Sequence, residues 1–93
     1  MRLETTEVND IKQCIHAIDQ QANVYLFGSR TDDKKKGGDI DLLIISSKIN
    51  FTEKLQLKIC IMEKLGEQKL DIIASPDTKT PFVKLAMETA IIL

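Results

Sequence analysis

The sequence contains a single histidine, His16, and few cysteines, and this scarcity removes two kinds of catalytic site. Triad hydrolysis is excluded because it needs a histidine paired with a nucleophile, and His16 lies among polar neighbours without one. Cys14 and Cys60 have no cysteine or histidine at metal-ligand spacing, which argues against zinc. We expect both to be buried, reduced thiols; a disulfide between them is the less favoured alternative.

The sequence also lacks long apolar runs and a strong net charge. No apolar run approaches the roughly 18 residues of a membrane span, and the first ten residues contain no apolar signal region. The net charge of -1 gives no general attraction to nucleic acid or to an anionic membrane. We therefore expect a cytoplasmic protein without membrane binding or direct nucleic-acid binding.

The 93 residues, 43% of them hydrophobic, predict one small soluble domain over residues 1–93. We expect a mixed α/β (α+β) fold, in which helices flank a small mixed three-stranded sheet in the order α-β-(α)-β-α-β-α. Apolar periodicity and turn residues place the helices at about 6–21, 51–65 and from Pro81 onward, and the strands at 24–27, 39–46 and 69–74. The polar segment 31–38 is either a short helical turn or a loop.

Each helix has an apolar stripe that we expect to face the sheet. Asn50 with Glu53 forms a box-like start for the second helix, and Gly66 ends it. In the last helix, Thr80 is the cap and Pro81 the first residue. The expected buried stripes are Val8, Ile11, Ile15, Ile18 and Ala22; Phe51, Leu55, Ile59, Met62 and Leu65; and Phe82, Leu85, Ala86 and Ala90.

Acidic residues gather at the starts of two predicted strands. Strand side chains alternate between faces, so Asp39 and Asp41 share one face, an arrangement best explained by a bound cation. The middle helix is long enough to join parallel strands, which brings Asp71 to the same end of the sheet. If the first strand runs antiparallel to the second, Gly28 and Ser29 also arrive there.

The turn at Gly28 and Ser29 has two interpretations. A glycine leaves no side chain between the main chain and a ligand, so the turn could hold phosphate oxygens, although a plain turn is the commoner meaning of this pair. The lysines at 34–36 fit a solvated loop better than a binding site, since Asp32 and Asp33 offset their charge.

These residues together resemble a known family. Gly28-Ser29-Arg30, then Asp39-Ile40-Asp41 with apolar residues behind it, then the later strand acid Asp71, are similar to the nucleotidyltransferase superfamily of the polymerase-beta type. The short length and the ending TPFVKLAMETAIIL resemble the minimal nucleotidyltransferases, which are antitoxin partners of HEPN-domain toxins. The segment 31–38 departs from relatives, which often carry a short turn with Arg and Ala there.

The resemblance implies a chemistry and a partner. Asp39, Asp41 and Asp71 would be catalytic and would hold one or two Mg²⁺ ions, with Asp71 also orienting or deprotonating the acceptor hydroxyl. Gly28, Ser29 and Arg30 would bind the phosphates of ATP. The reaction implied is transfer of AMP to a hydroxyl, as of a tyrosine, on a HEPN toxin that forms a complex with this chain.

Two alternatives stay open. The same fold could neutralise a partner by binding alone, with the acids serving a structural purpose. It could also transfer nucleotides to a small molecule or an RNA end, although the sequence stops at Leu93 and we expect the partner to present the acceptor. The choice of triphosphate and the oligomeric state are not predicted.

Overall fold

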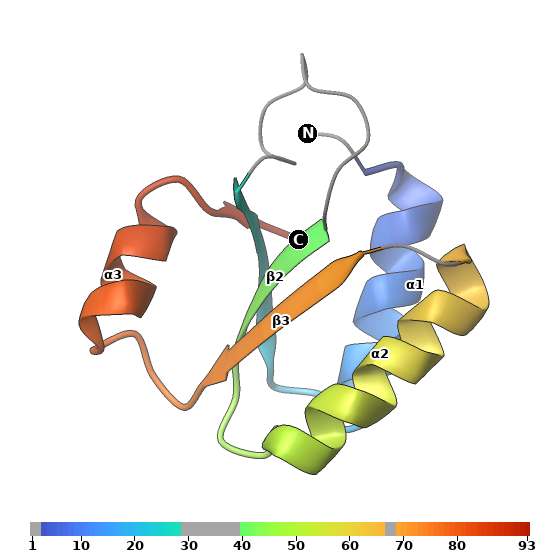
Figure 1. The fold of residues 1–93 in the computed structure, drawn as a ribbon, viewed down its shortest axis with the longest axis horizontal. Coiled ribbons are helices and arrows are strands. Elements are labelled where there is room, and N and C mark those ends of the chain that lie inside the picture. Colours follow the sequence, from blue (N-terminus) through green and yellow to red (C-terminus); the bar gives the residue numbers. More distant parts are fainter. Residues whose placement is uncertain (1–2, 29–39, 67–68) are drawn as a thin grey trace.

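A computed structural model describes residues 3–28, 40–66 and 69–93 as three helices and four strands (Figure 1). The elements are α1 (Thr5–His16), β1 (Asn23–Phe27), β2 (Ile40–Ile45), α2 (Phe51–Leu65), β3 (Leu70–Ser75), α3 (Pro81–Met87) and β4 (Ile91–Ile92). The α/β class and the predicted element order are confirmed, and β4 extends the sheet beyond the three strands expected. Within the described ranges, no helix is long and apolar enough to cross a membrane.

The sheet has the strand order β3-β2-β1-β4 and is mixed. β2 pairs with β3 in parallel, as predicted, and with β1 in antiparallel fashion, which is the condition under which Gly28 was expected to reach the aspartates. β2 is therefore an interior strand. β4 pairs with β1, and the Leu93 amide donates to the Val24 carbonyl oxygen at 2.9 Å. Two residues are too short to show a strand period, which is why the sequence pattern missed β4.

Helices cover both faces of the sheet, α1 and α2 on one and α3 on the other (Figure 1). The alternation along β2 explains this, since Ile40, Leu42 and Ile44 point into the larger core and Leu43 into the smaller. All five residues of the predicted first-helix stripe belong to this core, with Ile11, Ile15 and Ala22 buried and Val8 and Ile18 packed against them. The helix is shorter than predicted: α1 ends at His16 rather than near residue 21, so Ile18 and Ala22 lie between α1 and β1. The smaller core contains Leu43, Val83 and Ala86, with Tyr25, Phe27, Ile45, Ile73 and Met87 packed around them.

The ends of α2 are as predicted, but its buried face is not. The Thr52 and Glu53 amides donate to Asn50 Oδ1 at 3.1 and 3.5 Å, and Gly66 is the C-cap. The core side carries Leu57 and Ile61. The helix has two apolar stripes, so periodicity alone cannot tell which one packs. Of the stripe expected to be buried, Phe51, Leu55 and Ile59 are 71%, 47% and 61% exposed, and Met62 and Leu65 are half-buried.

For the last helix, too, the start was predicted correctly and the buried face was not. α3 begins at Pro81 after Thr80, as predicted, and Ala86 is buried. Val83 fills the smaller core, whereas Phe82 and Leu85 are exposed and Ala90 lies beyond the helix. In a helix of seven residues, one step along the chain turns the side chain by about 100°, so a small error in orientation exchanges the buried and exposed residues.

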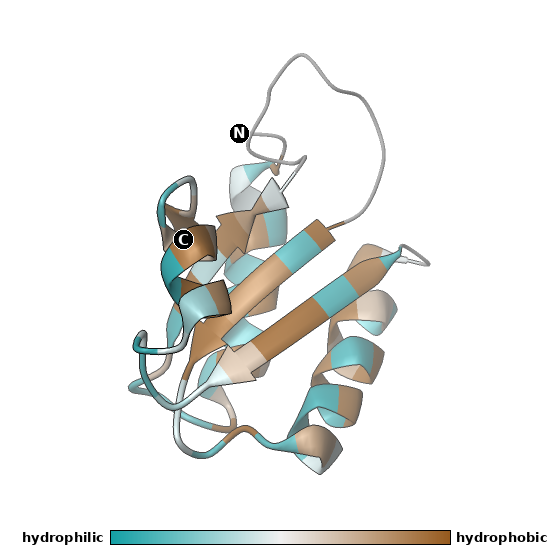
Figure 2. Cartoon of the chain, turned by 60° about the vertical axis from the view of Figure 1, so that its left-hand side comes forward, coloured by the Kyte–Doolittle hydropathy of each residue, from teal (hydrophilic) through white to brown (hydrophobic). Residues whose placement is uncertain are grey.

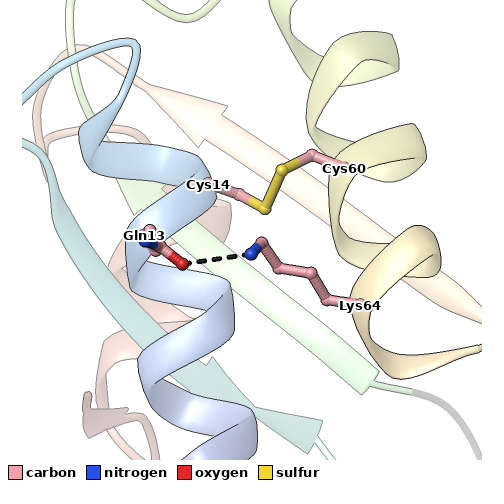
Figure 3. The surroundings of a disulfide bond; sticks show 4 residues. All are labelled: Gln13, Cys14, Cys60 and Lys64. Carbon is pink, nitrogen blue, oxygen red and sulfur yellow. Dashed lines mark hydrogen bonds between the residues drawn. A yellow bond between two sulfur atoms is a disulfide. The ribbon is translucent and has the colours of Figure 1, made fainter.

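The expectation of reduced cysteines is wrong, because Cys14 and Cys60 form a disulfide between α1 and α2 (Figure 3). The two helices pack side by side on one sheet face and bring together Cα atoms that are 46 residues apart in sequence to 6.0 Å, within disulfide range. Lys64 Nζ donates to Gln13 Oε1 at 3.0 Å beside the disulfide. Linear spacing does not reveal such a pair.

Candidate functional site

The end of β1 and the starts of β2 and β3 lie together at one edge of the sheet, as predicted. The parallel register places Asp41 opposite Asp71, and the antiparallel register places Phe27 opposite Asp41. Gly28 follows directly and leaves β1 at the same end. Figure 2 shows hydrophilic bands near the starts of the otherwise hydrophobic β2 and β3 strands, the part of each strand that contains the aspartate. Gly28, Asp41 and Asp71 therefore share one edge of the sheet.

The two aspartates point to the α3 side of the sheet. Their neighbours Ile40, Leu42 and Ile72 are buried in the core beneath α1 and α2, so alternation directs both carboxylates to the opposite face. Asp41 is half-buried, whereas Asp71 is exposed. Adjacent strands lie about 4.8 Å apart, so two carboxylates in register form a compact pair of oxygen donors.

Gly28 is packed against this pair. Its φ is +77°, a left-handed conformation that favours glycine. A Cβ at this position would overlap Asp41 Oδ2 and would lie 3.2 Å from Asp41 Cγ. The backbone thus approaches the Asp41 carboxylate more closely than any side chain would permit. The sequence suggested a close approach of the main chain here, although not that Asp41 itself is the near group.

Three of the predicted site residues, Ser29, Arg30 and Asp39, lie outside the described residues, as does the whole segment 31–38. Asp39 directly precedes Ile40, the first residue of β2. Within 3–28, 40–66 and 69–93, no group of three or more His, Cys, Asp or Glu side chains is placed to hold a metal. The described part of the site therefore consists of one carboxylate pair and the glycine beside it.

The chemistry of this donor set fits a hard divalent cation. Mg²⁺ is bound by carboxylate oxygens together with water and substrate phosphates, and it commonly takes only one or two protein carboxylates. Asp41 and Asp71 supply such a pair at this edge of the sheet, where Asp71 is exposed and Asp41 is half-buried against Gly28. The residues present therefore fit Mg²⁺ better than a thiolate- or imidazole-bound metal.

A further aspartate, Asp19, was not singled out from the sequence. It lies near the other end of β2, where it contacts Ser46. Ser46 Oγ donates to Asp19 Oδ2 at 2.5 Å, and the Gln21 amide donates to Oδ1 at 3.0 Å. These hydrogen bonds, helped by Lys48 and His16, hold the pKa of Asp19 below its ordinary value against the opposing effect of burial. Asp19 thus ties the α1–β1 turn to the end of β2 and has no part in the carboxylate pair.

The single histidine, His16, also serves the turn. Its Nε2 donates to the Ala22 carbonyl oxygen at 3.2 Å, since a carbonyl can only accept. This agrees with its predicted position at the helix edge.

Comparison with known proteins places the chain in a family. No curated protein matches it. Residues 9–93 match the family described as "Polymerase beta, Nucleotidyltransferase", and this range covers α1 from its middle, the whole sheet, α2 and α3. The chain therefore belongs to the polymerase beta nucleotidyltransferase family, whose members generally transfer nucleotides from nucleoside triphosphates with Mg²⁺.

Proposed function

We propose that this chain is a minimal nucleotidyltransferase that acts as an antitoxin, transferring AMP from ATP to a hydroxyl, most simply that of a tyrosine, on a HEPN-domain toxin. The observation that carries the proposal is the register pair Asp41–Asp71 beside Gly28, because it brings two carboxylates and a glycine turn to one edge of the sheet. The family match supports nucleotidyl transfer in general. The proposal goes beyond the family match in three respects: the toxin as acceptor, ATP as the nucleotide donor, and the antitoxin role.

In this proposal, Asp41 and Asp71, joined by Asp39, would hold Mg²⁺. The bound ion would neutralise charge on the triphosphate and on the leaving pyrophosphate. Gly28 would let the main chain approach the phosphates, with Ser29 and Arg30 following it as hydrogen-bond donors.

The proposed reaction is a nucleophilic substitution at the α-phosphorus of ATP. The acceptor oxygen forms a bond to the α-phosphorus, the bond between the α-phosphorus and the bridging oxygen breaks, and pyrophosphate leaves. Asp71 is the exposed member of the pair, which suits it to orient the acceptor hydroxyl and to accept its proton.

The direct test is incubation of the protein with Mg²⁺, labelled ATP and the protein encoded by the neighbouring reading frame, which the proposal identifies as the toxin, followed by intact-mass measurement of that protein. We expect an added AMP on the toxin, lost with Asp71→Asn. Glu88→Gln is the matched control because Glu88 is an exposed acid at the end of α3. An unlabelled toxin with folded, Mg²⁺-binding protein contradicts the proposal.

A second candidate is neutralisation by binding alone. The observation that favours it is the packing of the Asp41 carboxylate against Gly28, since such a contact also suits a purely structural aspartate. Asp39→Asn combined with Asp41→Asn separates the two: neutralisation that survives unchanged supports binding alone, and neutralisation that is lost while the complex persists supports transfer. Transfer that needs no protein partner would instead support a small-molecule or RNA acceptor.

A further inference from the structure

Helix α2 presents an apolar stripe to solvent in addition to its buried one. Phe51, Leu55 and Ile59 follow one another at intervals of four residues and are 71%, 47% and 61% exposed. Residues four apart lie on the same side of a helix, so these three form a continuous ridge about 12 Å long. Contiguous apolar surface of this kind marks contact sites more often than isolated exposed side chains do.

The ridge borders a shallow pocket between α2 and the sheet. The pocket has a volume of about 100 Å³ and is lined by Phe51, Lys54, Leu55, Lys58 and Ile72. Ile72 belongs to β3, which is an edge strand of the described sheet, and α2 lies alongside this strand (Figures 1 and 2). We call the ridge and the pocket together the α2–β3 groove; it consists of Phe51, Lys54, Leu55, Lys58, Ile59 and Ile72.

The charges in this groove are of one sign. Lys54 and Lys58 lie one turn apart, an arrangement of like charges that destabilises a helix by itself. Among the described residues, no aspartate or glutamate forms an ion pair with either lysine. The described lining of the pocket therefore offers two cations next to apolar surface and includes no carboxylate.

We propose that the α2–β3 groove binds an acidic amphipathic helix of a partner protein. Its apolar residues would pack between Phe51, Leu55 and Ile59, because ridges at intervals of four fit the grooves of a second helix. Its carboxylates would pair with Lys54 and Lys58. A second copy of this chain fits less well, since a symmetric dimer through this face would bring four lysines into one interface.

The groove also lies beside the candidate site. Ile72 contributes to the groove on one face of β3, and the preceding Asp71 emerges on the other face. A partner helix seated here is therefore held against the strand that carries Asp71. The inference rests on the surface alone and does not depend on the proposed transfer, so Asp71→Asn should leave this binding unchanged.

The test uses a fluorescently labelled helical peptide about four turns long, with leucines on one face and flanking glutamates, and a twin with lysines in place of the glutamates. With the full chain, we expect the acidic peptide to bind at least about tenfold tighter than its twin. Amide shift changes on titration should fall on α2 and β3. Lys54→Glu with Lys58→Glu should reverse the preference between the peptides.

The apolar part is tested separately. Leu55→Ser with Ile59→Ser should weaken binding of the acidic peptide at least about tenfold. Leu85→Ser on α3 removes a leucine elsewhere that is more exposed than Leu55, 65% against 47%, and should change nothing. Equal affinity for both peptides, absence of binding, or shift changes on α3 overturns the proposal, as does self-association of the free chain that these same groove substitutions abolish. Circular dichroism of each variant verifies that the exposed substitutions leave the fold intact.

Discussion

Asp41 and Asp71 occupy matching positions on neighbouring parallel strands, and their carboxylates emerge side by side on the α3 face of the sheet. Like charges directly across two strands destabilise a sheet by about 0.2–1 kcal/mol, and a cation bound between the two carboxylates would relieve that repulsion. From this relationship we predict that the stability of the protein depends on Mg²⁺.

Mg²⁺ should therefore stabilise the wild-type chain, and Asp71→Asn should remove most of that effect. A ligand at 100 times its Kd adds about 2.7 kcal/mol to the free energy of unfolding, and in a domain of this size each kcal/mol raises Tm by about 4–8 °C. Without Mg²⁺, the variant should melt at or slightly above the wild-type temperature because the repulsion is gone. Thermal melts with Mg²⁺ and with EDTA measure both effects. A variant that keeps the full Mg²⁺ shift would show that Asp71 is not a ligand.

Gly28→Ala should impair both folding and the site. The new Cβ meets the Asp41 carboxylate and forces a left-handed φ on alanine, strain of about 1–3 kcal/mol that denaturant unfolding measures. Gly66→Ala is the matched control, since Gly66 also has a positive φ but no atom within 4 Å of its Cβ. We expect both to lose stability, and only Gly28→Ala to lose the Mg²⁺ shift.

A double variant separates the contact from the backbone strain. Adding Asp41→Ala to Gly28→Ala removes the overlapping carboxylate, so the two stability losses should be non-additive, with the double variant more stable than their sum predicts. The same addition to Gly66→Ala should be additive. Additive losses at Gly28 would mean that the main chain at Gly28 moves away from Asp41.

The parts of the fold that depend on contacts between residues close in sequence were predictable, and those that depend on tertiary packing were not. Helix α2 contains an example of each. Asn50, Glu53 and Gly66 define its ends through contacts within a few residues, so both ends could be predicted. Its orientation could not, because Phe51 and Leu57 head two apolar stripes and only the packed neighbours choose between them. The Cys14–Cys60 disulfide and the strand β4 likewise depend on tertiary proximity.

The candidate site was predictable to the extent that topology brings distant residues together. Alternation along β2 and the parallel crossover placed Asp41 and Asp71 at one edge, and the structure has them in register. The contact of Gly28 with Asp41 needed coordinates because it depends on the φ of one glycine. The Asp19–Ser46 hydrogen bond joins residues 27 apart with no motif around them, so nothing in the sequence signalled it.

The disulfide should contribute substantially to stability. Cys14 and Cys60 close a loop of 46 residues, and the loop-entropy relation gives about 4 kcal/mol for a loop of this length. Reduction by dithiothreitol should lower the free energy of unfolding in urea by up to that amount. Cys14→Ala with Cys60→Ala should show the lower stability without reductant and no further change when it is added. Equal stability of the oxidised and reduced wild type would mean that α1 and α2 are held by packing alone.

Asp19 should make stability sensitive to acid. Its pKa in the folded protein is lowered chiefly by the Ser46 hydroxyl, so its contribution is complete above the pKa of the unfolded chain, about 3.9, and is lost as the pH falls from there through the folded value. Asp19→Asn should therefore flatten the urea-unfolding profile on the acid side of about pH 4 and lower stability at neutral pH. Ser46→Ala removes the largest cause of the shift and should flatten it in the same way. Asp10→Asn on α1 is the control, since none of the described hydrogen bonds involves its side chain, and it should keep the wild-type profile. A wild-type acid profile in Asp19→Asn would assign the acid sensitivity to other carboxylates and would leave the buried Asp19–Ser46 hydrogen bond without a measurable role in folding.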